Sequence, residues 1–290
     1  CTPPSTHYAL ASMALESGRN VLCEKPLVTK VEHARELLKM AKDKGLYLGC
    51  CGNRFLQARK FKEIQRIMEE GEIGSPYKIT MIHRVNRGRP GIEYQPQSRW
   101  FLDRSIAGGG ILLDWGPYDF AVLNEWLKPV RVEVQGAWTR QPKTGVDPIG
   151  IKNDVETHVG AMTRYELADG RKIWLHYERA SCTYGEAYNH TEIEGIEGAV
   201  RWDTYYWGDC VTFVKDSGGE IVTETKDFSD PSFDPMEVPI RSFVNLLQGK
   251  ENLALVNEDA VFNFLCLQAI YECAETGLSQ VIERSGLYGL

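Results

Sequence analysis

The chain has 290 residues, of which 43% are hydrophobic and 25% are charged, and its formal net charge is −7. This is ordinary globular composition with enough apolar material for a core, and the length suits one large domain or two ordinary ones. The apolar runs are far shorter than the roughly 18 residues that span a bilayer, and an acidic balance without a basic block argues against binding to nucleic acid.

The sequence begins with CTPPSTHYALA, without a methionine and without a polar lead-in. Thr2, Pro3 and Pro4 have the character of the turn after a strand, and Ser5 is suited to cap a helix. We therefore expect the chain to begin inside a domain and to be truncated at its amino terminus.

The first 53 residues alternate between helices and short apolar strands. Apolar spacing predicts a helix over 5–18, and the strand NVLC follows it. A second helix is predicted over about 30–45, with Gly45 as its end, and the strand LYLGCCG comes next. Strands and helices that alternate at this length are typical of a parallel α/β sheet.

After residue 53 the pattern changes to runs of strands separated by tight turns. We expect a helix near 57–70, a long strand from 76, a helix over 108–127, and closing helices near 239–248 and 257–277. The other predicted strands lie near 130–140, 155–167, 171–181, 189–195, 198–203, 210–216 and 219–226. Successive strands with this spacing predict a mostly antiparallel sheet. The stretch 86–98, rich in Gly and Pro, is the long loop that we expect to carry function.

The eight cysteines form no CxxC pair, which removes support for a zinc ribbon or a thioredoxin-like site. Several lie in apolar runs, where a buried and reduced thiol is expected. A reducing cytoplasm is therefore favoured over a compartment that forms disulfides. No histidines have the spacing of a motif such as HExxH, so we expect no metal site.

Residues 21–27 read VLCEKPL, a short strand that ends in a Glu-Lys-Pro turn. Pro26 keeps Lys25 out of the helical conformation. At the carboxyl end of a parallel strand, this turn would aim the lysine into the crevice where such sheets bind ligands. Taken alone, the three residues favour a solvated lysine paired with Glu24.

The predicted helix over 108–127 follows three glycines, which would let a ligand or a second backbone approach and would expose helix N–H groups. Asp114 and Tyr118 lie four residues apart, so they share one face of this helix. A phenol can act as a general acid or base if a nearby cation lowers its pKa, and Lys25 could be that cation. A half-buried aromatic and an exposed carboxylate remain the alternative interpretation.

In order along the chain, TPPSTH, EKPL and GGGILLDWGPYD resemble the motifs of the glucose-fructose oxidoreductase/inositol dehydrogenase/rhizopine-catabolism oxidoreductase family. The resemblance extends over essentially the whole chain, since AVFNFLCLQAIYECAETG is similar to the last helix of the family. One departure is that Phe101 follows Trp100, where many members have Arg. No G-x-G-x-x-G motif is present, so the choice between NAD and NADP cannot be read from this sequence.

The resemblance implies an α/β plus α+β protein. Residues 1–53 would be the carboxyl-terminal part of a Rossmann-type parallel sheet domain. Residues 54–290 would be a substrate-binding and oligomerisation domain with a mostly antiparallel open sheet, its last helix able to pack back on the first domain.

The resemblance also implies roles for single residues. The catalytic residues would be Lys25, Asp114 and Tyr118. The cofactor would be bound by Thr2, Pro3, His7, Glu24, Lys25 and Arg54. The substrate would be bound by Arg99, Trp100, Asp114 and Tyr118, with His158 as a further candidate that faces either the cleft or the sheet. From their residue type alone, Trp100, Trp115, Tyr205, Tyr206 and Trp207 suit stacking on a sugar ring, and a place in the core fits them equally well.

The activity implied is hydride transfer between NAD or NADP and a sugar, cyclitol or related polyol, in a cytoplasmic homodimer or homotetramer formed through the open sheet. Two alternatives stay open. One is a glycosidase that uses NAD for a transient redox step, and the other is a binding or regulatory member of the family without turnover.

Overall fold

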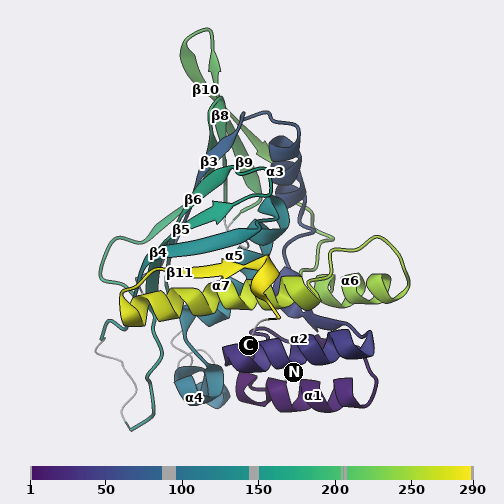
Figure 1. Ribbon diagram of the computed structural model, residues 1–290. Coiled ribbons are helices and arrows are strands. Elements are labelled where there is room, and N and C mark those ends of the chain that lie inside the picture. Colours follow the sequence, from purple (N-terminus) through teal and green to yellow (C-terminus); the bar gives the residue numbers. More distant parts are fainter. Residues whose placement is uncertain (1, 87–95, 144–149, 204, 206–207, 289–290) are drawn as a thin grey trace.

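The computed structural model describes residues 2–86, 96–143, 150–203, 205 and 208–288. It contains two sheets, one with two strands near the amino terminus and one with nine strands that dominates the molecule (Figure 1). None of the helices among the described residues is both long and apolar enough to cross a membrane.

The amino-terminal part is a small parallel α/β unit. Its strands are β1 (Val21–Cys23) and β2 (Leu48–Cys50), which pair in parallel. Its helices are η1 (Pro4–Thr6), α1 (His7–Glu16) and α2 (Val31–Lys44). The last of these ends where Gly45 adopts a φ of 63°, a conformation that glycine enters without steric cost. The predicted alternation of strand and helix is confirmed.

The large sheet has the order β10-β9-β8-β7-β3-β6-β5-β4-β11. Its strands are β3 (Pro76–Arg84), β4 (Arg131–Arg140), β5 (His158–Glu166), β6 (Lys172–Ala180), β7 (Tyr188–Gly195), β8 (Gly198–Trp202), β9 (Cys210–Ser217), β10 (Glu220–Asp227) and β11 (Gln280–Glu283). The β3–β6 pair is parallel and the other neighbouring pairs are antiparallel. The predicted fold class is therefore confirmed.

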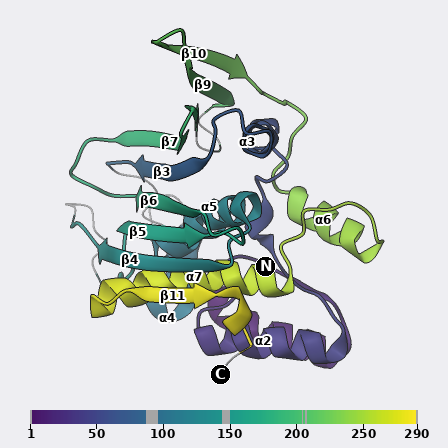
Figure 2. The same ribbon diagram turned by 45° about the horizontal axis from the view of Figure 1, so that its top comes forward.

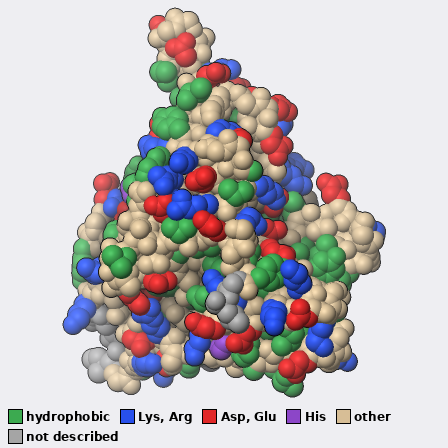
Figure 3. All heavy atoms as spheres, viewed as in Figure 1, with side chains coloured by type: hydrophobic (Ala, Val, Ile, Leu, Met, Phe, Trp, Pro, Cys, Tyr) green, Lys and Arg blue, Asp and Glu red, His purple; other side chains and the backbone are tan. Residues whose placement is uncertain are grey.

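Two helices, α5 (Ile111–Leu127) and α7 (Asn257–Thr276), lie against one face of this sheet (Figure 2). Alternation along the strands sends side chains such as Tyr165 and Tyr177 into that interface, where both are fully buried. The opposite face is open and exposes Trp138, Met162 and Trp174. Figure 3 shows acidic and basic side chains interspersed on the visible surface, without a large patch of one sign.

The remaining helices connect these layers. They are η2 (Cys51–Asn53), α3 (Arg59–Glu69), η3 (Pro96–Leu102), α4 (Arg104–Ala107), α6 (Val238–Leu247) and η4 (Arg284–Gly286). The sequence predicted neither α4 nor the edge strand β11, because each has only four residues and no extended periodicity. Most of the predicted loop over 86–98 lies outside the described residues.

The last helix is joined to the amino-terminal unit. The side chain of Asn257, at the start of α7, accepts a hydrogen bond of 2.8 Å from the backbone N–H of Leu48. The backbone N–H of Cys50 donates to the carbonyl of Leu255 at 2.9 Å, and α2 packs against α7. The small parallel unit and the large sheet are thus held together by the carboxyl-terminal helix.

Candidate active site

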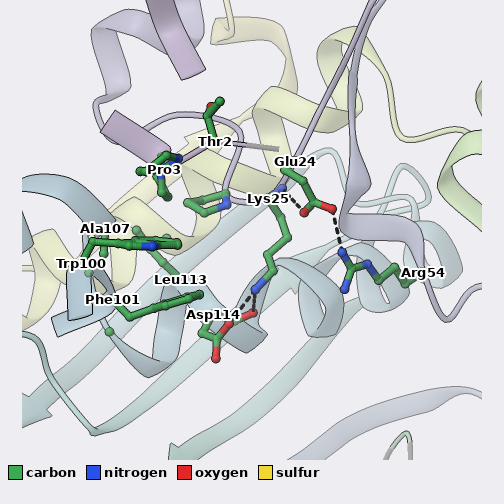
Figure 4. A pocket seen from close by; sticks show the side chains of 14 residues that line it. Thr2, Pro3, Glu24, Lys25, Arg54, Trp100, Phe101, Ala107, Leu113 and Asp114 are labelled. Carbon is green, nitrogen blue, oxygen red and sulfur yellow. Dashed lines mark hydrogen bonds and ion pairs between the residues drawn. The ribbon is translucent and has the colours of Figure 1, made fainter. Parts of the chain in front are cut away.

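A cavity of about 450 Å³ lies where β1 ends and α5 begins (Figure 4). Its size is that of a small-molecule pocket. The turn after β1 forms one wall, and η3 and the start of α5 form the other. The lining residues are Thr2, Pro3, Pro4, Glu24, Lys25, Pro26, Arg54, Trp100, Phe101, Ala107, Gly109, Gly110, Leu113 and Asp114.

Lys25 crosses this pocket to the first turns of α5. Its Nζ atom lies 2.6 Å from Oδ1 of Asp114 and 2.7 Å from the carbonyl oxygen of the same residue. The side chain of Lys25 is only 12% exposed, so it is not an ordinary solvated charge. The peptide bond between Lys25 and Pro26 is cis. The ammonium of Lys25 therefore pairs with Asp114, and not with the neighbouring Glu24.

Glu24 instead pairs with Arg54, which follows η2. The Nη2 atom of Arg54 lies 2.7 Å from Oε1 of Glu24, while Oε2 of Glu24 accepts a hydrogen bond from the backbone N–H of Lys25. Burial alone would lower the pKa of Arg54, but the neighbouring Tyr118 and Glu24 together raise it. The pocket therefore holds two cations, each with its own carboxylate.

Tyr118 lies on the same helical side as Asp114, as the spacing of four residues predicted. Its side chain is buried, with a relative exposure of 4%. The Nζ atom of Lys25 lies 5.1 Å from the ring centroid and Cζ of Arg54 lies 5.4 Å from it. Tyr118 is thus next to both cations but is not among the residues that line the cavity.

The glycines before α5 serve close packing within the protein. A Cβ atom on Gly110 would come within 1.9 Å of the Glu156 carbonyl oxygen, and one on Gly109 within 2.1 Å of the Tyr271 hydroxyl. The N–H groups of Gly110 and Leu112 donate to the carboxylate of Glu156 at 2.9–3.1 Å. The expectation of exposed N–H groups is therefore wrong for these two, because a side chain of the protein already accepts their hydrogen bonds.

Glu156 was not identified from the sequence. It is 8% exposed and also accepts a hydrogen bond of 2.7 Å from the hydroxyl of Tyr271. Burial raises the pKa of Glu156, although the hydrogen bonds from Tyr271 and the backbone N–H groups oppose this. Glu156 is therefore hydrogen-bonded to the amino-terminal end of α5. This is the end of the helix from which Asp114 contacts Lys25.

The structure brings some of the other predicted residues to the pocket and leaves others outside. Thr2, Pro3 and Trp100 line it, and the ring of Trp100 stacks on Phe101 with centroids 3.9 Å apart. His7 is buried behind the turn. Its Nδ1 atom lies 2.9 Å from the carbonyl oxygen of Pro26, and its Nε2 atom lies 3.0 Å from that of Thr2. His7 therefore supports the wall without being part of it.

Arg99 and His158 do not line the pocket. Arg99 is exposed at η3. His158 begins β5 and lies on the same side of the sheet as Trp138, with its Nε2 atom 2.8 Å from Oε1 of Glu178. Of the two orientations considered for His158, the structure has the one within the sheet. Of the other aromatic candidates, Trp115 and Tyr205 do not line the pocket, and Tyr206 and Trp207 lie outside the described residues.

The parallel unit that ends at a pocket, completed by residues from a second and larger sheet, has the architecture of α/β proteins that bind dinucleotides at the carboxyl ends of their strands. Residues 1–50 match the family described as the oxidoreductase family with an NAD-binding Rossmann fold, and residues 61–201 match the GFO/IDH/MocA C-terminal domain. The chain belongs to this family of oxidoreductases, as its motifs indicated.

Two individual relatives match almost the whole chain. The chain is 26% identical over 289 residues to a 1,5-anhydro-D-fructose reductase from Ensifer adhaerens, which covers 97% of the chain and 78% of that protein. It is 24% identical to a D-xylose 1-dehydrogenase [NADP(+)] from Haloarcula marismortui, over 95% of the chain and 71% of that protein.

Solved structures share the fold. A levoglucosan dehydrogenase in complex with NADH and L-sorbose superposes with a TM-score of 0.77 at 20% identity, covering 98% of this chain and 79% of that one. An aldose-aldose oxidoreductase from Caulobacter crescentus, complexed with glycerol, gives a TM-score of 0.70 at 22% identity, covering 98% of this chain and 77% of that one.

Proposed function

We propose that this protein transfers a hydride between a nicotinamide cofactor, NAD or NADP, and a sugar, cyclitol or related polyol. The observation that carries the proposal is the ion pair between Lys25 and Asp114 inside the cavity, with the ring of Tyr118 beside Lys25. The family membership supports the reaction type, and the names of the relatives support the substrate class.

The residues of the cavity fit the nicotinamide end of such a cofactor. Thr2 and Pro3 of the first turn and Leu113 of α5 offer flat, mostly apolar walls, while Glu24 and Lys25 offer polar groups to a ribose. The cofactor would supply the hydride chemistry, for which the protein has no group of its own. The rings of Trp100 and Phe101 offer a surface on which a sugar can stack.

In the proposed mechanism Lys25 binds the reacting oxygen of the alcohol and stabilises the negative charge that develops on it. Asp114 holds the ammonium of Lys25 in place at 2.6 Å. Tyr118 accepts the proton of the alcohol, and the cations of Lys25 and Arg54 beside its ring favour the negatively charged phenol oxygen. Since Tyr118 is buried and does not line the cavity, the ammonium of Lys25 would give one of its protons to the phenolate and take up the proton of the alcohol in exchange.

The test is turnover by the intact protein with a panel of sugars and polyols, each with NAD and with NADP, followed by reduced cofactor absorbance. We expect one cofactor and one group of related polyols to stand out. Release of sugar from glycosides without net cofactor reduction would support the glycosidase alternative instead. Cofactor binding without either reaction would support a binding or regulatory member of the family.

We also propose that the protein forms a homodimer or homotetramer through the open face of the large sheet. The exposed side chains of Trp138, Met162 and Trp174 on that face support this. Light scattering of the intact protein and of a Trp174→Glu variant tests it, since a dimer or tetramer held by this face should dissociate in the variant. A monomeric parent protein would contradict the proposal.

A further inference from the structure

Tyr205, in the connection between β8 and β9, is anchored at both of its ends. Its carbonyl oxygen accepts a hydrogen bond of 2.9 Å from Nζ of Lys60, and its hydroxyl donates one of 2.6 Å to Oδ1 of Asp119. Its backbone has a φ of +28°, which is unusual for a residue that is not glycine and requires support from the surroundings.

The first anchor is a buried cation. Lys60 lies on α3 with its side chain 2% exposed, and besides Tyr205 it binds the carbonyl oxygen of Gly208 and lies 3.4 Å from a carboxylate oxygen of Asp209. Burial lowers the pKa of Lys60, while Asp209 opposes this. A buried ammonium is costly unless it is paired and hydrogen-bonded. Among the described residues, the hydrogen bonds and the ion pair of Lys60 go to Tyr205, Gly208 and Asp209.

The second anchor is a fully buried carboxylate next to Tyr118 in the sequence. Asp119 accepts hydrogen bonds from Nε and Nη2 of Arg179 at 2.6 and 2.8 Å and from the hydroxyl of Tyr177 at 2.8 Å. With the bond from Tyr205 it therefore has four donors. Such a satisfied network fixes its members in one arrangement.

Between these anchors the ring of Tyr205 packs into the aromatic residues that surround Tyr118. Its centroid lies 4.0 Å from that of Phe55, 5.6 Å from that of Trp115 and 6.4 Å from that of Tyr118. Phe55 in turn meets the ring of Tyr118 edge to face at 5.3 Å. Tyr205 therefore packs against the Tyr118 ring both directly and through Phe55.

We propose that Tyr205 is a positioning residue, which holds the phenol of Tyr118 against Lys25 and Arg54, with Lys60 and Asp119 as its two anchors. The proposal rests on the proposed function of Tyr118 as the proton acceptor. A phenylalanine at position 205 would fill the same space in the core. The hydrogen bond from the Tyr205 hydroxyl to the buried carboxylate of Asp119 therefore indicates that the ring has to be held in one position. Among the described residues, the charged or titratable groups around Tyr118 include Lys25 with Asp114, Arg54 with Glu24, and Tyr205 with Asp119 and Arg179.

The experiment is a double-mutant cycle on kcat in the intact protein, with Tyr205→Phe and Tyr118→Phe. We expect Tyr205→Phe to lower kcat about 10-fold, since small displacements of a reacting group carry large rate penalties, and to change KM for cofactor and sugar less than about twofold. In the Tyr118→Phe background, Tyr205→Phe should have no further effect, because it acts through Tyr118. Lys60→Met should reproduce the pattern.

Tyr77→Phe is the matched control. It also removes a phenol hydroxyl that donates to a carboxylate, that of Glu194 at 2.7 Å. The Tyr77 side chain is exposed, however, and kcat should not change. An equal loss of kcat in the two Tyr118 backgrounds would mean that Tyr205 only stabilises the fold, and an unchanged kcat in Tyr205→Phe would also overturn the proposal.

If the parent protein turns over no sugar or polyol, the proposed function fails. A second measurement then tests the positioning role of Tyr205 without turnover. The tyrosinate absorbance of Tyr118 is taken as the difference between each protein and its Tyr118→Phe partner across a pH titration. Tyr205→Phe should move the midpoint of this difference to higher pH, because the phenol is no longer held against its cations. An unmoved midpoint would overturn the positioning role independently of any turnover.

Discussion

Lys25 and Asp114 are 89 residues apart in the sequence, and their side chains form an ion pair of 2.6 Å inside the candidate active site. The same lysine lies 5.1 Å from the ring of Tyr118, one helical turn further along α5. The ion pair therefore joins the turn after β1 to the helix that packs on the large sheet. In the proposed mechanism, this places the ammonium of Lys25 beside Tyr118, so that both side chains act on the same oxygen of the ligand.

The first prediction concerns Lys25→Met, which keeps most of the side-chain volume and removes the charge. We expect kcat/KM for the sugar or polyol to fall by about 10²–10⁴-fold, because the developing oxyanion loses its cation. Lys152→Met is the control, since it removes another lysine–aspartate pair of 2.6 Å at a side chain that is 50% exposed. Equal turnover in both variants would contradict the role given to Lys25.

The second prediction concerns the stacked rings of Trp100 and Phe101. Phe101→Ala removes one wall of the pocket and the stacking partner of Trp100, so we expect KM for the sugar to rise about 10-fold, the equivalent of about 1.4 kcal/mol. Phe101→Tyr keeps the ring and should keep KM within about twofold. The measurement is initial rate against sugar concentration at saturating cofactor, and a rise in KM for cofactor alone would assign the rings to the cofactor instead.

Much of this site could be predicted because its signals are local. The EKP turn follows a strand directly, and Asp114 and Tyr118 are four residues apart on one helix. A buried partner for Asp119 could also be predicted, because a carboxylate inside the apolar stretch of α5 has to be paired. The identity of that partner, Arg179 on β6, follows from strand order and register, which depend on the whole sheet.

Glu156 shows why the rest could not be predicted. Its carboxylate accepts hydrogen bonds from Gly110 and Leu112, more than 40 residues away, and no periodicity links these segments. The glycines alone were compatible with a ligand or with a second backbone, and only the packing of Glu156 and Tyr271 against them distinguishes the two.

The third prediction is the effect of Asp119→Asn on stability. The change leaves the guanidinium of Arg179 buried with a neutral partner, and we expect unfolding to become easier by about 3–5 kcal/mol. Urea unfolding followed by tryptophan fluorescence measures this. Asp169→Asn is the control, because Asp169 and Arg171 form an exposed pair of the same 2.6 Å length, and its effect should stay below about 1 kcal/mol.

The last prediction uses the pH dependence of Glu156. Burial raises its pKa in the folded protein above the ordinary value of 4.5, so the folded state binds its proton more tightly than the unfolded chain does. This contribution to stability is complete below the unfolded pKa and is lost as pH rises through the folded pKa. Glu156→Gln cannot titrate, so the difference in unfolding free energy, parent minus variant, should fall from acidic toward neutral pH.

The variant also loses part of the acceptor for Gly110, Leu112 and Tyr271, so we expect an offset of about 1–3 kcal/mol at every pH. Urea unfolding of both proteins at a series of pH values separates the sloping part from this offset. A difference that rises with pH would show that the hydrogen bonds from Tyr271 and the backbone outweigh burial, with the pKa of Glu156 lowered and its carboxylate charged at the start of α5.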